Sequence, residues 1–273
     1  MNFFNITYTN FLTSPLEQFI VFPLWAHKLG LVDFSITNPL IILLLLLFIL
    51  FVFYHCTIEV TDENLPKIHS GEIDFWIVPT RLQSTVEMLQ KVILSMVSDN
   101  IKGNKGARYF PLVFFLFMFI FSLNAIGLIP YSFTLTSHII VTLSIAVAVF
   151  TGIQIVGVRK HGIHYFSIFL PPGTPLVLAF LLVPIELISF IFKPISLSIR
   201  LFANMMAGHT LLKVIAGFAF TLMSCTGILF LAHYVPVLIL IPLMLLELAV
   251  ALIQSFVFSI LICIYINEAT NLH

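Results

Sequence analysis

The amino-acid sequence predicts an all-α polytopic membrane protein with about five to six membrane helices. The chain of 273 residues is 60% hydrophobic and only 9% charged, whereas ordinary soluble domains carry roughly 25% charged residues. Its apolar residues form runs of about 20 or more, the length that a helix needs to cross a bilayer. The two longest runs predict a long, tilted, antiparallel helix hairpin in the C-terminal half, and one amphipathic stretch predicts a surface helix.

The apolar runs divide a single membrane domain, residues 1–273, into successive parts. One unbroken run predicts the first span, two neighbouring runs predict a pair of spans, and the last two predict the long hairpin. The parts are an N-terminal segment over 1–38, a first span over 39–57, an amphipathic surface helix over 80–98, a two-span hairpin over 109–158 and a helix hairpin over 172–268.

The distribution of basic residues predicts the orientation of the chain. Six lysines and arginines fall between the first and second spans, and Arg159 and Lys160 follow the third span. The loop 130–138 has none, and the N-terminal segment has only Lys28. Because loops on the inner side carry an excess of Lys and Arg, we expect the N-terminus on the outer side.

Apolar residues in the stretch 80–98 recur at intervals of three and four, with polar residues on the opposite face. This spacing is typical of an amphipathic helix. Such a helix either lies on the inner membrane surface or packs on another subunit, and the sequence leaves both possibilities open. The apolar positions are Leu82, Val86, Leu89, Ile93 and Met96.

Two stretches of the C-terminal half, 176–223 and 228–266, are too long for simple spans. As continuous helices they would measure about 70 Å and about 58 Å at a rise of about 1.5 Å per residue. The hydrocarbon core of a bilayer is only about 30 Å thick. Each stretch is therefore either two spans or one long, strongly tilted helix.

Arg200 is the most informative charged residue of this half. An arginine at bilayer depth costs about 3 kcal/mol on insertion scales and over about 10 kcal/mol in simulations of an isolated helix. We therefore expect a site at which charge is moved or held inside the membrane. Between residues 171 and 266 the charged side chains are Glu186, Lys193, Arg200, Lys213 and Glu247.

The polar residues of the two long stretches come into register if these stretches form an antiparallel hairpin. Placing Arg200 opposite Gln254 brings His209 close to Glu247, because nine residues forward on one helix nearly match seven backward on the other. Asn204 follows Arg200 by four residues and lies on the same helix face. Two polar pairs that meet at one offset predict a functional seam.

Simpler explanations stay open for several of these residues. Gln254 could only hydrogen-bond across helices, and His209 with Glu247 could bind a metal, although two ligands make a poor site. Glu186 lies about 21 Å before Arg200 along the helix, on a similar face. Side chains that could simply reach the membrane interface are Lys193, Lys213, His138, His161 and His164.

Several segments resemble subunit a of the F-type ATP synthase. SIRLFANMMAGH over 198–209 resembles the signature segment of that family, and ELAVALIQ over 247–254 resembles its second signature. Further similar segments are IGLIPYSFT over 126–134, ICIYIN over 262–267 and SPLEQF over 14–19. The acidic segment 56–74 departs from the family pattern, and we expect a contact with another subunit there.

The resemblance implies a stationary proton-translocating subunit that does not itself catalyse ATP chemistry and needs no cofactor or metal. Two offset half-channels would carry protons to and from the carboxylates of a rotating c-ring. The implied partners are the c-ring proteolipids, the peripheral-stalk and other membrane-sector subunits, and the lipid bilayer. The residues carried over are Arg200 facing the ring, Asn204 and Gln254 beside it, His209 and Glu247 in the entry half-channel, and Glu186 in the exit half-channel.

The order of the two entry residues also predicts a location. Histidine at position 209 and glutamate at position 247 resemble the mitochondrial form, and 29 phenylalanines suit an AT-rich organellar gene. We therefore expect a multi-pass protein of the mitochondrial inner membrane. An antiporter-type subunit would show internal repeats with broken helices, a scaffold would not need Arg200, and zero net charge disfavours nucleic acid as a partner.

Overall fold

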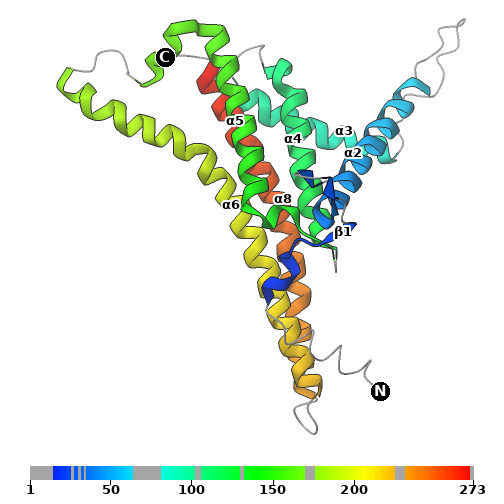
Figure 1. Cartoon of the computed structure of the whole chain (residues 1–273). Helices are drawn as coiled ribbons and strands as arrows, with labels where there is room; N and C mark the ends of the chain where they lie inside the picture. The colour runs from blue at the N-terminus through cyan, green and yellow to red at the C-terminus, as the bar shows by residue number, and fades with distance from the viewer. Residues whose placement is uncertain are drawn as a thin grey trace, which may run out of the picture.

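The computed structural model is helical throughout its membrane part, which confirms the predicted fold class (Figure 1). The structure describes residues 15–25, 28–29, 32–33, 35–63, 81–101, 106–129, 132–169, 176–224 and 231–270. The long helices are α2 (Asn38–Glu63), α3 (Arg81–Asn100), α4 (Gly106–Gly127), α5 (Ile139–His161), α6 (Leu176–Ser224) and α8 (Tyr234–Thr270). Within the acidic segment, residues 64–74 lie outside the described part of the chain.

Membrane-spanning length is found in most of these helices. Among the described residues, α4, α5, α6 and α8 are long and apolar enough to cross a membrane, and α2 has a shorter apolar part, Asn38–Phe53. The chain is therefore a multi-pass membrane protein. Together these five helices fall within the number that the sequence predicts.

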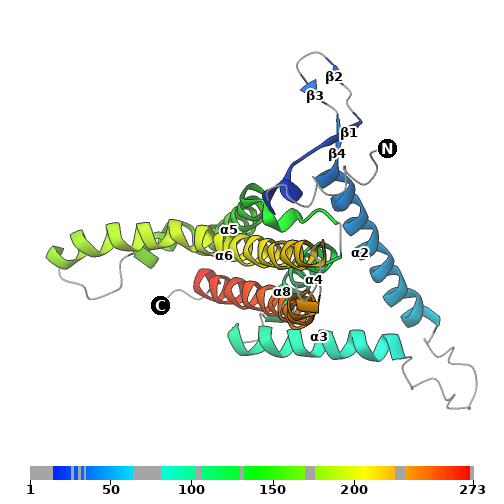
Figure 2. The same cartoon turned by 90° about the horizontal axis from the view of Figure 1, so that it is seen from below.

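The two C-terminal stretches each form one long helix, which answers the question that the sequence left open. α6 has 49 residues and α8 has 37. Pro184 and Pro194 lie inside α6; each removes one backbone hydrogen bond, yet the helix continues through both. The two helices run antiparallel, and the C-terminal part of α6 lies beside the N-terminal part of α8 in both views (Figure 2). The N-terminal part of α6 leans away from α8 (Figure 1).

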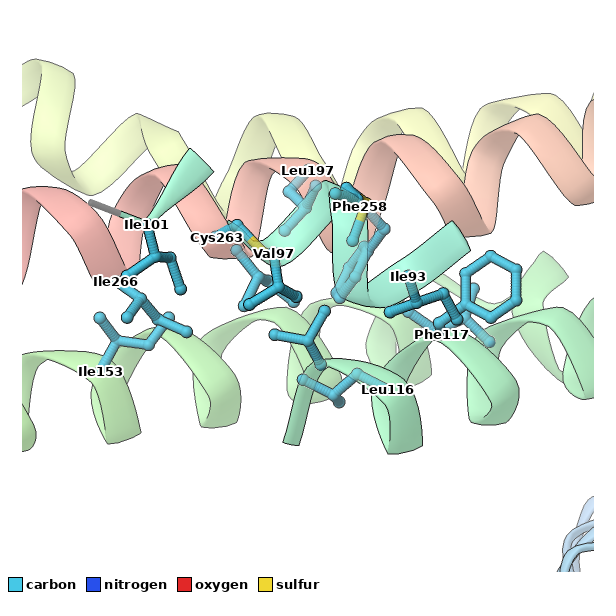
Figure 3. Packing of buried hydrophobic residues seen from close by; sticks show 14 of the residues in the cluster. Ile93, Val97, Ile101, Leu116, Phe117, Ile153, Leu197, Phe258, Cys263 and Ile266 are labelled. Carbon is cyan, nitrogen blue, oxygen red and sulfur yellow. The ribbon is translucent and has the colours of Figure 1, made fainter. Parts of the chain in front are cut away.

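The apolar face of α3 packs on helices of its own chain, α4 and α8. Whether the remaining surface of α3 lies on the membrane or against another subunit stays a prediction. Ile93 and Val97 of α3 meet Phe117 of α4 and Phe258 and Cys263 of α8 (Figure 3). All of these side chains are buried, so this core fixes α8 against the rest of the bundle through burial of apolar surface and dense packing.

Short elements in the N-terminal segment were not expected from the sequence. A 3₁₀ helix, η1 (Pro15–Phe19), precedes two small antiparallel pairs of strands. The strands are β1 (Pro23–Trp25), β2 (Lys28–Leu29), β3 (Val32–Asp33) and β4 (Ile36–Thr37). The side chain of Asn38 accepts a hydrogen bond from the backbone N–H of Phe22 at 3.0 Å and donates one to the carbonyl of Ile20 at 3.3 Å, which ties this segment to the start of α2.

The connection between α4 and α5 folds back among the helices. Its short 3₁₀ helix η2 (Leu135–Ser137) contacts α2, α4, α5 and α6. Phe133 and Leu135 join Leu46 of α2 and Leu123 of α4 in a second buried core. A further 3₁₀ helix, η3 (Gly162–Phe169), follows α5.

Candidate functional site

The hairpin of α6 and α8 brings His209 and Glu247 together, as the register predicts. The Nε2 atom of His209 lies 3.4 Å from Oε1 of Glu247, and the side chains are only 13% and 5% exposed. This separation is an ion-pair contact but exceeds the usual length of a hydrogen bond. Both oxygens of Glu247 consequently lack a hydrogen-bond partner among the described residues. The pair is a buried acid and imidazole with unused hydrogen-bonding capacity.

Gln254 meets a different residue from the one that the register predicts. Its Oε1 atom accepts a hydrogen bond from Nδ2 of Asn204 at 3.0 Å. Asn204 lies one helical turn beyond Arg200, so the hairpin is shifted by about one turn at this point. We name Asn204, His209, Glu247 and Gln254 the polar seam. It contains two cross-helix contacts between α6 and α8.

Arg200 lies at the midpoint of α6 and is exposed, so none of the elements that the structure describes covers it. The opposite side of the helix is fixed. Leu201 is fully buried, and the hydroxyl of Ser198 lies 3.0 Å from that of Thr142 on α5, with both residues buried. The buried side of α6 holds the helix in place, and the guanidinium of Arg200 lies on its exposed side. An arginine at membrane depth normally has a partner.

Gly208 allows α6 and α8 to approach at the seam. A Cβ atom at this position would lie 2.8 Å from Oε1 of Glu247, closer than side-chain atoms tolerate. A cavity of about 240 Å³ opens beside it, bordered by Asn204, Ala207 and Val250. This volume has room for several water molecules next to the carboxylate.

Glu186 does not join the seam. It is half-buried on the N-terminal part of α6 and makes no ion pair with any of the described residues. Lys193, which could simply have reached the interface, instead contacts Glu268 of α8 at 2.6 Å and lies 5.3 Å from the ring centre of Tyr265. This pair links the two helices on the side toward Glu186.

Other border residues also have specific contacts. The amino group of Lys160 donates a hydrogen bond to the carbonyl oxygen of Thr270, and Nε2 of His161 lies 3.1 Å from the same oxygen. These basic groups cap the C-terminus of α8, where unpaired carbonyls attract positive charge. His164 is exposed. His138 is partly exposed, and its Nε2 atom is buried.

Sequence reasoning missed several residues of this region. Ser198 and Gly208 lie inside the segment 198–209 that carries the family resemblance, yet no role was assigned to them. Glu268 lies just beyond the apolar stretch 228–266, and the sequence analysis did not consider it. The position of Gly208 opposite Glu247 would have followed from the His209–Glu247 pairing, since adjacent residues share a turn.

The fold and the seam define a class: polytopic membrane proteins that hold ionisable residues at membrane depth between two long helices. Such residues mark ion or proton pathways more often than structural sites. No group of three or more His, Cys, Asp or Glu suited to a metal ion occurs among the described residues. The seam thus combines a carboxylate, an imidazole and two amides, all of which can form hydrogen bonds.

Sequence comparison places the chain within this class. The sequence profile of the family described as ATP synthase A chain matches residues 39–267. ATP synthase subunit a of Marchantia polymorpha is 45% identical over 262 residues, covering 95% of this chain and 99% of the relative. The protein of the same name from Pylaiella littoralis is 49% identical over 261 residues, with 95% and 99% coverage. That of Rhodospirillum rubrum is 42% identical over 261 residues, with the same coverage. The chain belongs to the ATP synthase A chain family.

Proposed function

We propose that the chain is the stationary proton-translocating subunit of the ATP synthase membrane sector. The relatives reported above carry the name ATP synthase subunit a. The single observation that supports the proposal most is the exposure of Arg200 at the midpoint of α6. Because a bare guanidinium in lipid is costly, another protein surface with a carboxylate is the fitting partner. A ring of proteolipid subunits would supply one.

The polar seam fits the entry half of a proton path. His209 and Glu247 are in contact, are almost fully buried and have free hydrogen-bonding capacity. A proton that reaches them from the outer side can pass to a carboxylate on the ring through the water-sized space beside Gly208. The Asn204–Gln254 bond lies between this pair and Arg200 along α6 and orients the polar groups there.

Arg200 would separate the two halves of the path. Its fixed positive charge favours the ionised form of a carboxylate opposite, so the proton leaves that carboxylate before it passes the arginine. The same charge repels a proton that would cross directly from entry to exit. Glu186, four turns before Arg200 on α6, would receive the proton on the exit side.

The proposed location is the mitochondrial inner membrane, with the basic C-terminal end of α5 on the matrix side. The order of histidine before glutamate in the seam supports this location. The partners would be the c-ring, peripheral-stalk and other membrane-sector subunits, and lipid. Much of α6 is not covered by its own chain, which leaves surface for these contacts.

A crosslinking experiment tests the proposed ring contact. Ala207 is exposed on the face of α6 that carries Arg200. In the assembled complex, Ala207→Cys should form a disulfide with a cysteine beside the membrane carboxylate of a co-purifying proteolipid, because such a bond requires Cα atoms within about 7 Å. Ile155→Cys on α5, which is 56% exposed, serves as the matched control. Equal crosslinking of both, or absence of a proteolipid, would remove the proposal.

A further inference from the structure

The segment between α4 and α5 is unusual for a membrane protein, because irregular backbone lies among the spanning helices. Residues 132–138 contact α2, α4, α5 and α6 through η2 and its flanks. Phe133 and Leu135 are buried in an apolar core with Leu46. Non-helical backbone at membrane depth is tolerated where protein buries it or where it lines a water-filled space.

Polar atoms at this segment are buried without protein partners. Both side-chain atoms of Asn124 on α4 have no hydrogen-bond partner among the described residues, although the residue is fully buried. The same holds for the hydroxyl of Thr136 and for Nε2 of His138. Buried polar groups are nearly always satisfied by protein or by ordered water. We name these three residues the η2 cluster.

Neighbouring hydroxyls show that the segment satisfies its polar atoms where protein partners are within reach. Thr134 donates a hydrogen bond to Oγ of Ser137 at 2.8 Å, and Ser137 donates to the carbonyl of Thr134 at 2.6 Å. Among the described residues, the side chains of the η2 cluster have no such protein partner. Ordered water is a partner that suits buried polar atoms of this kind.

Gly127 connects the η2 cluster to the polar seam. A Cβ atom at Gly127 would lie 2.8 Å from Cγ2 of Thr134 and 3.8 Å from Nε2 of His209. The η2 segment, α4 and the imidazole of the seam therefore meet at one point. Asn124 lies three residues before Gly127 on α4, so both share a helix face.

His138 lies where this polar region reaches the protein surface. The residue is partly exposed while its Nε2 atom is buried, and its ring stacks on Phe133 with a centroid distance of 5.1 Å. Stacking fixes the orientation of the ring. Burial lowers the pKa of His138, which favours the neutral imidazole that can accept a proton.

We propose that His138 is the proton-accepting residue at the outer mouth of the entry path, and that Asn124 and Thr136 hold the water that joins it to His209. This inference rests on the proposed function. The acceptor nitrogen binds a proton from water that reaches it from the surface, which gives the imidazolium. The imidazolium then releases the same proton to the internal water, so the ring ends in the tautomer in which it began. No bond other than N–H and O–H forms or breaks.

Removal of the imidazole tests the acceptor role. In vesicles with the assembled complex, His138→Ala should slow proton-driven ATP synthesis by about tenfold, below the full effect of a positioned proton-transfer group because water remains in the path. Imidazole added on the outer side should restore the rate, whereas imidazole on the inner side should not. Unchanged synthesis, or a loss that imidazole does not restore, would overturn the proposed role of His138.

Cysteine labelling tests the water path without relying on activity. In a background lacking Cys56, Cys225 and Cys263, a small charged thiol reagent from the outer side should modify Asn124→Cys and Thr136→Cys rapidly. Leu123→Cys and Leu135→Cys are the matched controls, because these neighbours are buried in the apolar core. Equal modification of all four cysteines, or of none, would overturn the water path.

The two proposals fail separately. If Arg200→Ala stops ATP synthesis but the four cysteines label alike, the water path through η2 is wrong and the proposed function stands. If Asn124→Cys and Thr136→Cys label faster than their leucine controls but Arg200→Ala does not change ATP synthesis, the ring-facing role of Arg200 is wrong. If His138→Ala does not assemble, His138→Gln replaces it, because glutamine retains hydrogen bonding without exchanging protons. ATP synthesis by His138→Gln should be slow, and added imidazole should not change its rate.

Discussion

The two halves of α8 lie in different surroundings. Its C-terminal half carries Phe258, Ile262 and Cys263 into a dry core with α3, α4 and α5, where all three are almost fully buried. Its N-terminal half lies against α6 and carries Glu247 into the polar seam. There the two carboxylate oxygens of Glu247 have no hydrogen-bond partner among the described residues, and a cavity lies beside the carboxylate. Apolar burial stabilises the C-terminal half of α8. The N-terminal half contains buried polar groups, which lower the stability of the fold.

This difference indicates how one helix can hold a proton site steady. Packing in the core fixes the rotation and height of α8, and the basic cap from Lys160 and His161 fixes its end. The seam can then contain loosely partnered groups without loss of the fold. We expect changes in the seam to alter proton transfer and changes in the core to alter stability.

Within the comparison of the two halves of α8, changes to the buried pair of His209 and Glu247 should have the largest effect on proton transfer. His209→Glu and Glu247→His singly should each slow proton-driven ATP synthesis by about a hundredfold, because two like groups then face each other. The double exchange restores an acid beside an imidazole and should recover much of the rate. Synthesis assays on vesicles check this, and equal loss in all three variants would show that the pair does not act together.

A smaller effect is expected at Gly208. Gly208→Ala places a methyl group against the carboxylate of Glu247, and such overpacking costs about 1–3 kcal/mol of stability. Because the carboxylate is then displaced from His209, we expect ATP synthesis to slow by about tenfold. Shortening the acid with Glu247→Asp in the same chain should restore part of the lost synthesis. Gly217→Ala on the same helix is the control, since a Cβ atom there meets nothing within 4 Å. Equal effects of both alanines would contradict the close approach.

Removal of the exit carboxylate should have a weaker effect. Glu186→Gln should slow proton release by a few-fold, because water and other polar groups can still conduct. Proton uptake measured with a pH-sensitive dye during ATP hydrolysis reports the change. Flux that matches the unmodified complex across the whole pH range would make Glu186 a packing residue.

The smallest effect on proton transfer is expected in the core. Phe258→Ala should destabilise the assembled subunit by about 3–5 kcal/mol and leave the rate per assembled complex unchanged. Thermal unfolding of the purified complex measures the first quantity and vesicle assays the second. Ile253→Ala, at a side chain that is 58% exposed, should change neither. A lower rate per assembled complex in Phe258→Ala would contradict the claim that the core affects only stability.

The sequence was sufficient for the fold class and for the meeting of His209 with Glu247. Both follow from apolar run length and from counting turns along helices, which depend on local geometry. The sequence was not sufficient to identify the partner of Gln254. Arg200 and Asn204 lie one turn apart on the same face of α6, so the helix pattern alone does not decide which of them Gln254 meets. The burial of η2 could not be predicted either, since it depends on contacts with several distant helices.

Arg200→Ala offers the most direct test of the central claim that α6 and α8 position a charge to direct proton flow. Arg200 is exposed on α6, so its removal leaves the buried contacts of Ser198 and Leu201 in place and should not prevent assembly. Vesicles with the assembled variant should make no ATP under an imposed proton gradient. Synthesis at the unmodified rate, in a variant present at normal amounts, would contradict the account.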